Sequence, residues 1–109
     1  MIIDFSKVEE KKLPNYFGGD KELCARLNVD ENGKILLGTL KPGASIGLHT
    51  HDTSSEIIYF ISGTAFILYD GKEETAAPGM CHYCPKGHSH SLKNNGTEDL
   101  VFFAAVPRQ

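Results

Sequence analysis

Turn-forming residues recur about every six to twelve positions along this chain, and they limit each regular element to a short strand. Glycine follows asparagine or proline at turns such as Asn32-Gly33 and Pro78-Gly79, and the segments between turns are rich in β-branched and aromatic residues. The segments expected to form strands include 22–29, 35–40, 56–62, 65–70, 73–77, 80–84, 90–94 and 100–106. So many short strands predict an all-β sandwich or barrel, because a closed sheet leaves few unpaired edges.

Length and charge restrict the class of protein further. A chain of 109 residues corresponds to one domain, and its 40% hydrophobic and 23% charged residues are ordinary for a globular protein. The net charge of −3 disfavours nucleic acid as a partner, since phosphates are bound by basic surfaces. No apolar run approaches the ~20 residues of a membrane span, and residues 1–12 carry acidic side chains and lack the apolar region of a secretory signal. We therefore expect a cytoplasmic protein with no membrane partner.

The three cysteines, Cys24, Cys81 and Cys84, do not suggest a disulfide framework, because their number is odd. Cys81 and Cys84 form a C-x-x-C pair, which also occurs in redox motifs and in zinc sites. A redox pair opens a helix, whereas this pair lies in an expected strand, where positions three apart face opposite sides. We interpret both as small apolar strand residues, with a redox or zinc role as the alternative.

Two segments carry particular structural expectations. Residues 4–13 contain the only helical signals and predict one or two helical turns, with Ser6 as the N-cap. Residues 56–62 are apolar on both faces, so we expect this strand to be buried on both sides. Its outward side chains would be covered by the N-terminal segment or by a second subunit, and the second case predicts a homodimer. These side chains belong to Ile57, Tyr59 and Ile61.

All five histidines lie in two short segments of the chain. His49 and His51 are two positions apart, so on a strand both side chains point to the same side, about 6–7 Å apart. Glu56 opens an apolar strand, where a carboxylate is costly unless a partner or cation neutralises it. Its odd offset from His51 would place it on the opposite face of one continuous strand, but the four polar residues between them can form a loop that resets the register. With His90, the set would offer three imidazoles and one carboxylate, which suit a divalent transition metal with open coordination positions.

Both histidine segments match known sequence motifs. Residues 43–63 have the order Gly, five residues, His-x-His, four residues, Glu, six residues, Gly. Residues 79–94 have the order Gly, five residues, Pro-x-Gly, two residues, His, three residues, Asn. The two segments resemble the first and second conserved motifs of the cupin superfamily. The residues at the fixed positions are Gly43, His49, His51, Glu56, Gly63, Gly79, Pro85, Gly87, His90 and Asn94.

This resemblance implies a double-stranded β-helix, that is, a jelly-roll cupin barrel, formed as a single domain by residues 1–109. It also implies that one divalent transition-metal ion (Mn, Fe, Ni, Zn or Co) is bound inside the barrel by the residues that match the family's ligands. These residues are His49, His51, Glu56 and His90.

Three further residues have open roles. His88 lies two positions before His90 and is a candidate fifth ligand or a residue of the cavity mouth. His82 stands where the family usually has an apolar residue, and it would either line the cavity as a proton donor or form a hydrogen bond in a subunit contact. Arg26 is a candidate for binding an anionic ligand, although it faces away from the apolar side of its strand.

The fold does not determine the activity, because cupins include isomerases, dioxygenases, decarboxylases, lyases and ligand-binding modules. We expect a metal-dependent enzyme that acts on a small, anionic metabolite, with the metal as Lewis acid or oxygen activator. A non-catalytic module that binds a small molecule or sugar is the alternative. In both cases we expect an open metal site, reachable through the barrel mouth, with one or two positions for water or a small ligand and with His82 or His88 nearby.

Overall fold

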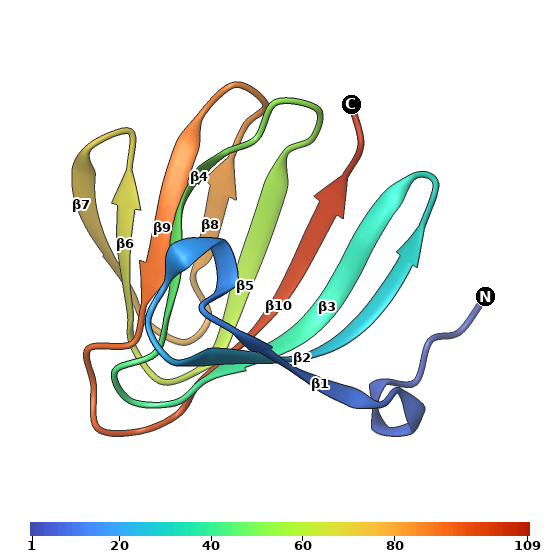
Figure 1. Ribbon diagram of the computed structural model, residues 1–109, viewed down its shortest axis with the longest axis horizontal. Coiled ribbons are helices and arrows are strands. Elements are labelled where there is room, and N and C mark those ends of the chain that lie inside the picture. Colours follow the sequence, from blue (N-terminus) through green and yellow to red (C-terminus); the bar gives the residue numbers. More distant parts are fainter.

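Two antiparallel sheets face each other in the computed structural model, which describes residues 1–109 (Figure 1). The larger sheet has the strand order β1-β2-β3-β10-β5-β8, and the smaller sheet has the order β4-β9-β6-β7. The strands are β1 (Glu10–Pro14), β2 (Glu22–Asp30), β3 (Gly33–Leu40), β4 (Ser45–Thr50), β5 (Glu56–Ser62), β6 (Ala65–Tyr69), β7 (Lys72–Ala76), β8 (Cys81–Cys84), β9 (Ser89–Lys93) and β10 (Leu100–Pro107). The expected all-β jelly-roll barrel is therefore confirmed.

The N-terminal region differs from its prediction. The only helices are two short 3₁₀ turns, η1 (Phe5–Lys7) and η2 (Tyr16–Gly18), and neither has the length or apolar character needed to cross a membrane. Asp4, not Ser6, caps η1, since its Oδ1 accepts a hydrogen bond from the Ser6 amide at 3.0 Å. Residues 10–14 form strand β1 because their backbone pairs with β2, which overrides their weak helical signal.

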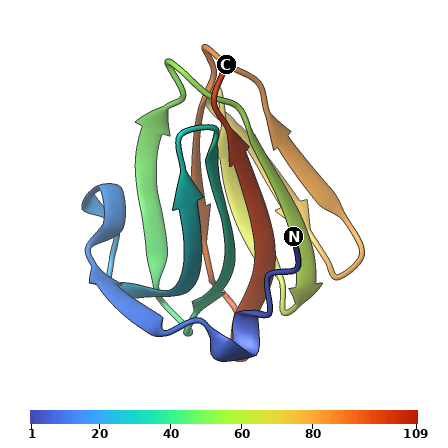
Figure 2. The same cartoon turned by 90° about the vertical axis from the view of Figure 1, so that its right-hand side faces the viewer.

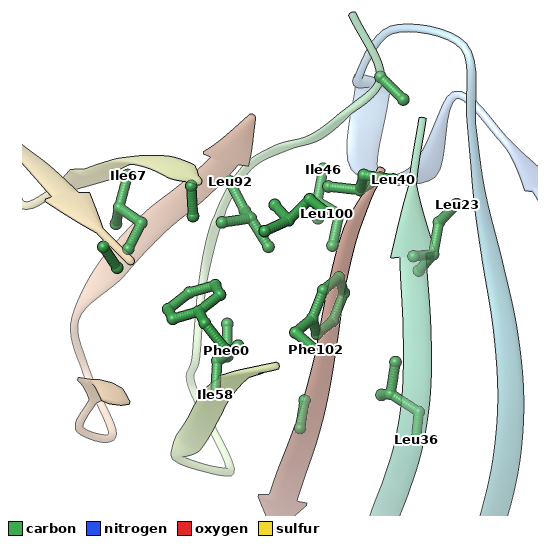
Figure 3. Packing of buried hydrophobic residues seen from close by; sticks show 14 of the residues in the cluster. Leu23, Leu36, Leu40, Ile46, Ile58, Phe60, Ile67, Leu92, Leu100 and Phe102 are labelled. Atoms are coloured by element: carbon green, nitrogen blue, oxygen red, sulfur yellow. The ribbon is translucent and has the colours of Figure 1, made fainter. Parts of the chain in front are cut away.

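The core lies between the two sheets, where the inward side chains of successive strands meet (Figure 3). Phe60 on β5 and Phe102 on β10 are register partners, and both are fully buried. Strand β5 alternates strictly, so Glu56, Ile58 and Phe60 point inward from the same strand. The hydrophobic core consists of Leu23, Ala25, Leu36, Leu40, Ala44, Ile46, Ile58, Phe60, Ala65, Ile67, Ala76, Leu92, Leu100, Phe102 and Ala104.

The prediction that residues 56–62 are buried on both sides is wrong for the single chain. Ile57, Tyr59 and Ile61 remain 41–47% exposed on the outer face of the larger sheet. The N-terminal segment runs instead along the outside of β10, where the Phe5 ring packs edge-on against Phe103 at 6.2 Å (Figure 2). This leaves the outer face of β5 and β8 uncovered.

Candidate metal centre

Four side chains from three segments of the chain converge at one end of the barrel interior. His49 lies on β4 and is the register partner of His90 on β9, while Glu56 is the first residue of β5. His51 follows the end of β4, and the loop after it resets the register, so that Glu56 points inward together with the histidines. The register expectation for this segment is confirmed by the burial of His51 and Glu56.

The donor atoms of these four side chains all lie within 4.8 Å of one another. Glu56 Oε1 is 3.0 Å from His51 Nε2 and 3.0 Å from His90 Nε2. His90 Nε2 is also 3.0 Å from His51 Nε2 and 3.1 Å from His49 Nε2. His49 Nε2 and Glu56 Oε1 are farther apart, at 4.0 Å. The residues that the sequence singled out as candidate ligands are therefore brought together in one cluster.

The Nδ1 atom of each imidazole points away from the cluster and has its own hydrogen-bond partner. His49 Nδ1 lies 2.8 Å from the carbonyl oxygen of Gly47, which only accepts, so this nitrogen carries the hydrogen and Nε2 presents a lone pair to the cluster. His51 Nδ1 lies 2.9 Å from the Ser54 hydroxyl, and His90 Nδ1 lies 2.9 Å from Nε2 of His82. These contacts allow all three Nε2 atoms to face the cluster as acceptors, which is the form in which neutral histidine binds a metal.

The carboxylate of Glu56 is buried among these nitrogens. Burial would raise the pKa of Glu56, but the close imidazoles of His49, His51 and His90 outweigh it and hold the pKa well below its usual range when no metal is bound. Glu56 therefore carries a negative charge in the barrel interior. A buried carboxylate beside converging lone pairs is unfavourable unless a cation is shared among them, and three nitrogens with one oxygen suit a divalent transition metal. The residues present thus fit the ion that the sequence motifs imply.

His82 is not a fifth member of the cluster but a hydrogen-bond partner of His90. It lies on β8, is 6% exposed, and its Nδ1 is 3.6 Å from Glu74 Oε1 at the barrel edge. Burial, and secondarily the nearby His90, lower the pKa of His82 to about 4. A neutral His82 can accept the Nδ1 hydrogen of His90, which fixes the orientation of that imidazole. From the sequence, His82 could either line the cavity or form a hydrogen bond in a subunit contact. The structure places it beside the cavity.

His88 lies outside the four-residue cluster, so the structure does not support a fifth ligand at this position. Its Nδ1 donates to Asp70 Oδ2 at 2.5 Å, and the Tyr69 hydroxyl is 3.3 Å from the same nitrogen. A hydrogen bond from the Ser89 amide, together with His88, holds the pKa of Asp70 below its usual value. The His88 carbonyl accepts the His51 amide hydrogen at 3.0 Å, which joins this exposed cluster to the rim of the candidate metal centre.

Arg26, the candidate for binding an anionic ligand, instead binds backbone carbonyls of the N-terminal segment. Its Nη1 donates to the carbonyl oxygen of Val8 at 2.5 Å and lies 3.5 Å from that of Phe5. Because Arg26 faces the outside of β2, its guanidinium fastens the N-terminal segment to the larger sheet. Its position in the strand alternation already placed Arg26 on the face opposite the apolar side chains, away from the barrel interior. The backbone carbonyls of the N-terminal segment account for its hydrogen bonds.

The cysteines behave as strand residues, as we interpreted them. Cys81 is exposed and Cys84 is buried, so the two point to opposite sides of β8, and neither they nor Cys24 form a disulfide. Cys84 is the register partner of Glu56, and burial, followed by the charge of Glu56, raises the pKa of Cys84 to about 11. Its thiol therefore stays protonated beside the candidate metal centre.

Sequence reasoning missed Phe17, whose ring lies flat against His49 with centroids 4.0 Å apart and planes inclined by 11°. Phe17 belongs to η2, which packs against β4 (Figure 1). The adjacent Gly18 and Gly19 signal an unusual backbone. No spacing rule, however, relates this loop to a histidine some thirty residues later.

A jelly-roll barrel with three histidines and a glutamate at one end of its interior defines the class of protein, and comparison with known proteins names it. The chain belongs to the cupin family, since the family model for the cupin domain matches residues 36–106. An oxalate-binding protein from Thermotoga maritima is 32% identical over 112 residues, covering 97% of this chain and 93% of that protein.

Solved structures agree with this assignment. The crystal structure of a predicted oxalate decarboxylase from Thermotoga maritima superposes with a TM-score of 0.93 at 27% identity, and the match covers 100% of both chains. KdgF from Halomonas sp. has a TM-score of 0.80 at 14% identity, covering 100% of this chain and 94% of that one, which shows a shared fold alone.

Proposed function

We propose that this protein binds one divalent transition-metal ion through His49, His51, Glu56 and His90, and that the bound ion holds a small dicarboxylate of the oxalate class. The convergence of three imidazole nitrogens and a buried carboxylate is the observation that carries the proposal. The similarity to an oxalate-binding protein supports the choice of ligand class. The ion would supply the positive charge that an anionic ligand needs inside the barrel.

The distances among the donor atoms support a site with open coordination positions. With bonds of about 2.1 Å, neighbouring ligands lie about 3.0 Å apart in an octahedron and about 3.4 Å apart in a tetrahedron, and opposite octahedral ligands lie about 4.2 Å apart. Four of the distances are 3.0–3.1 Å, the distance between His49 and Glu56 is 4.0 Å, and all four donor atoms lie within 4.8 Å of one another. The separations of 3.0–3.1 Å match neighbouring ligands of an octahedron, so an ion held by these four side chains would have room for further ligands.

A metal that accepts six ligands would have two positions left for a small ligand beside these four side chains. Two oxygens from the separate carboxylates of one small dicarboxylate could occupy both positions, whereas acetate has only one carboxylate to offer. We therefore expect chelation to make a dicarboxylate the preferred ligand.

A second candidate function is catalysis on such a ligand, and the cluster of His88, Asp70 and Tyr69 favours it. The Asp70 carboxylate orients the His88 imidazole, which is 43% exposed near the rim of the candidate metal centre. An imidazole held in this way can transfer a proton to or from a ligand that enters there. The enzyme and the binding module share the same metal site and differ in whether the ligand is turned over.

Metal analysis of the purified protein tests the first claim. We expect about one ion per chain in the wild type and a loss of most of it in His49→Ala, His51→Ala or His90→Ala, because each removes one ligand. His88→Ala is the matched control, since it removes a histidine outside the cluster. A folded His51→Ala protein that kept the full metal content would contradict the proposal.

Titration calorimetry of the metal-loaded protein tests the ligand. Oxalate should bind, acetate should bind far more weakly, and metal-free protein should bind neither. Equal affinity for oxalate and acetate would remove the chelation argument. Assays for oxygen uptake and for released carbon dioxide or formate then separate the two candidate functions, because a binding module leaves oxalate intact.

We also infer a homodimer formed through the uncovered outer face of β5 and β8. Ile57 and Tyr59 are register partners of Tyr83 and Cys81, which gives a continuous, exposed and largely apolar surface across both strands. A second copy of this surface, related by a two-fold axis, would cover it. Light scattering should give twice the mass of the chain, and Tyr59→Lys should reduce it. A wild-type monomer at micromolar concentration would exclude the dimer.

We also infer that the protein is cytoplasmic. Three free cysteines fit a reducing compartment. Cell fractionation of the native source would check this expectation.

A further inference from the structure

The loop between β1 and β2 has an unusual backbone for its sequence. Asn15, Phe17 and Lys21 have φ values of 50°, 51° and 56°, and Gly18 has a φ of 79°. A left-handed conformation is ordinary for glycine and tolerable for asparagine, but it is unfavourable for a bulky aromatic residue such as Phe17. Such a conformation persists only where the surrounding structure fixes it, and it is concentrated at functional sites.

Close backbone contact with β4 fixes this loop. A Cβ atom at Gly19 would overlap the Ser45 carbonyl, and one at Gly47 would overlap the carbonyl of Phe17. Ser45 also makes two hydrogen bonds with Asp20 in the loop. Its amide donates to the Asp20 carbonyl at 3.0 Å, and its hydroxyl accepts from the Asp20 amide at 2.8 Å. The loop is therefore anchored to the exposed edge of β4, next to the segment that carries His49 and His51.

The consequence of this anchoring is the position of the Phe17 ring. Although 52% of Phe17 is exposed, its ring stacks flat on the His49 imidazole at 4.0 Å. His49 is thus held at its edge by the Gly47 carbonyl and on one face by an aromatic ring. Apart from an edge-on contact with the neighbouring Tyr16 ring at 4.7 Å, the stack on His49 is the aromatic contact that this half-exposed ring makes.

We propose that Phe17 is a positioning residue of the metal centre, which fixes the plane of the His49 imidazole and shields that side of the ion from water. This inference rests on the proposed metal site and deepens it. The imidazoles of His90 and His51 are oriented in a similar way by hydrogen bonds with His82 and Ser54, respectively. His49 lies at the edge of the smaller sheet, so the flanking loop supplies its second constraint.

Two substitutions separate positioning from a structural role. Phe17→Leu removes the aromatic face but keeps an apolar side chain, and Phe17→Gly removes the ring while relieving the left-handed backbone. We expect both to lower the affinity for Zn²⁺ or Co²⁺, measured by competition with a chelator, by about tenfold or more, as is usual when an outer partner of a ligand is lost. Metal-free Phe17→Gly should unfold at the same temperature as the wild type or higher. Leu48→Ala, on the outward face of β4, is the matched control and should leave the affinity unchanged.

Metal affinities within twofold of the wild type in both variants would overturn the proposal, as would an equal loss of affinity in Leu48→Ala. A wild type that binds no metal would instead refute the proposed function. In that case the His49 resonances of the metal-free protein decide: Phe17→Leu should remove the ring-current shift and broaden the single Nδ1–H tautomer into a mixture. An unchanged tautomer would then refute positioning as well.

Discussion

The two ends of the barrel interior use polar groups in opposite ways. At the apolar end, the one fully buried polar side chain is Asn94, and all its partners are backbone groups. At the other end, His49, His51, Glu56 and His90 direct their inner atoms toward one another. A buried polar group that is satisfied by backbone is a structural element, whereas buried groups whose inner atoms converge on each other form a site that a bound ion would fit.

The same strands build both ends, because inward positions recur every two residues. Strand β5 carries Glu56 at one end and Phe60 at the other, and β9 places His90 and Leu92 in the same succession. Packing at the apolar end therefore fixes the strands that carry the candidate ligands. We expect stability to come mainly from the apolar end, and sensitivity to metal and pH mainly from the polar end.

The largest expected effect is at the apolar end. Phe102→Ala removes a fully buried ring in contact with the core and should lower the free energy of unfolding by about 3–5 kcal/mol. Urea denaturation with and without added metal should show the same loss, because the ring does not touch the candidate ligands. Phe103→Ala, on the outer face of the same strand, is the control and should have a smaller effect. A loss that disappears when metal is added would contradict the division between the two ends.

The next effect concerns acid sensitivity at the polar end. His82 has a pKa of about 4 in the folded protein, while an unfolded histidine titrates near 6.5. Between these values the unfolded chain takes up a proton that the folded chain refuses. The stability that neutral His82 contributes is therefore complete above pH 6.5 and is lost as the pH falls toward 4. The gap between the two pKa values limits this loss to about 3 kcal/mol.

Unfolding free energies of metal-free protein at pH 8, 6 and 5 would measure this loss. His82→Gln has no proton to take up, so its stability should fall less over the same range. Parallel pH profiles for the wild type and His82→Gln would contradict the assignment to His82.

The sequence predicted most of this arrangement, because it follows from periodicity and spacing. The inward set of Glu56, Ile58 and Phe60 follows from strand alternation, and the polar residues after His51 indicated the loop that resets the register. Strand β1 escaped prediction because most of its residues are exposed and charged, and it is held by backbone pairing with β2 rather than by an apolar pattern.

Contacts between segments far apart in the sequence could not be predicted from spacing. The stacking of Phe17 on His49 depends on a left-handed loop and on two glycines that let the backbones approach. The bond between His82 and His90 depends on how the edge strand β8 faces the smaller sheet. Both contacts arise from three-dimensional packing, which a sequence motif does not describe.

The smallest expected effect is at Asn94. Its Nδ2 donates to the carbonyls of Leu40 and Glu98 at 2.8 Å, and its Oδ1 accepts from the Gly96 amide at 2.9 Å. Asn94→Ala leaves these backbone groups without that partner and should lower the free energy of unfolding by about 2 kcal/mol, the usual penalty for a buried group left unsatisfied. Metal affinity, measured by chelator competition, should stay unchanged because Asn94 lies at the opposite end of the interior from the candidate ligands. If a folded Asn94→Ala protein lost metal affinity, the two ends would be coupled, and the strand framework would have to be treated as part of the metal centre.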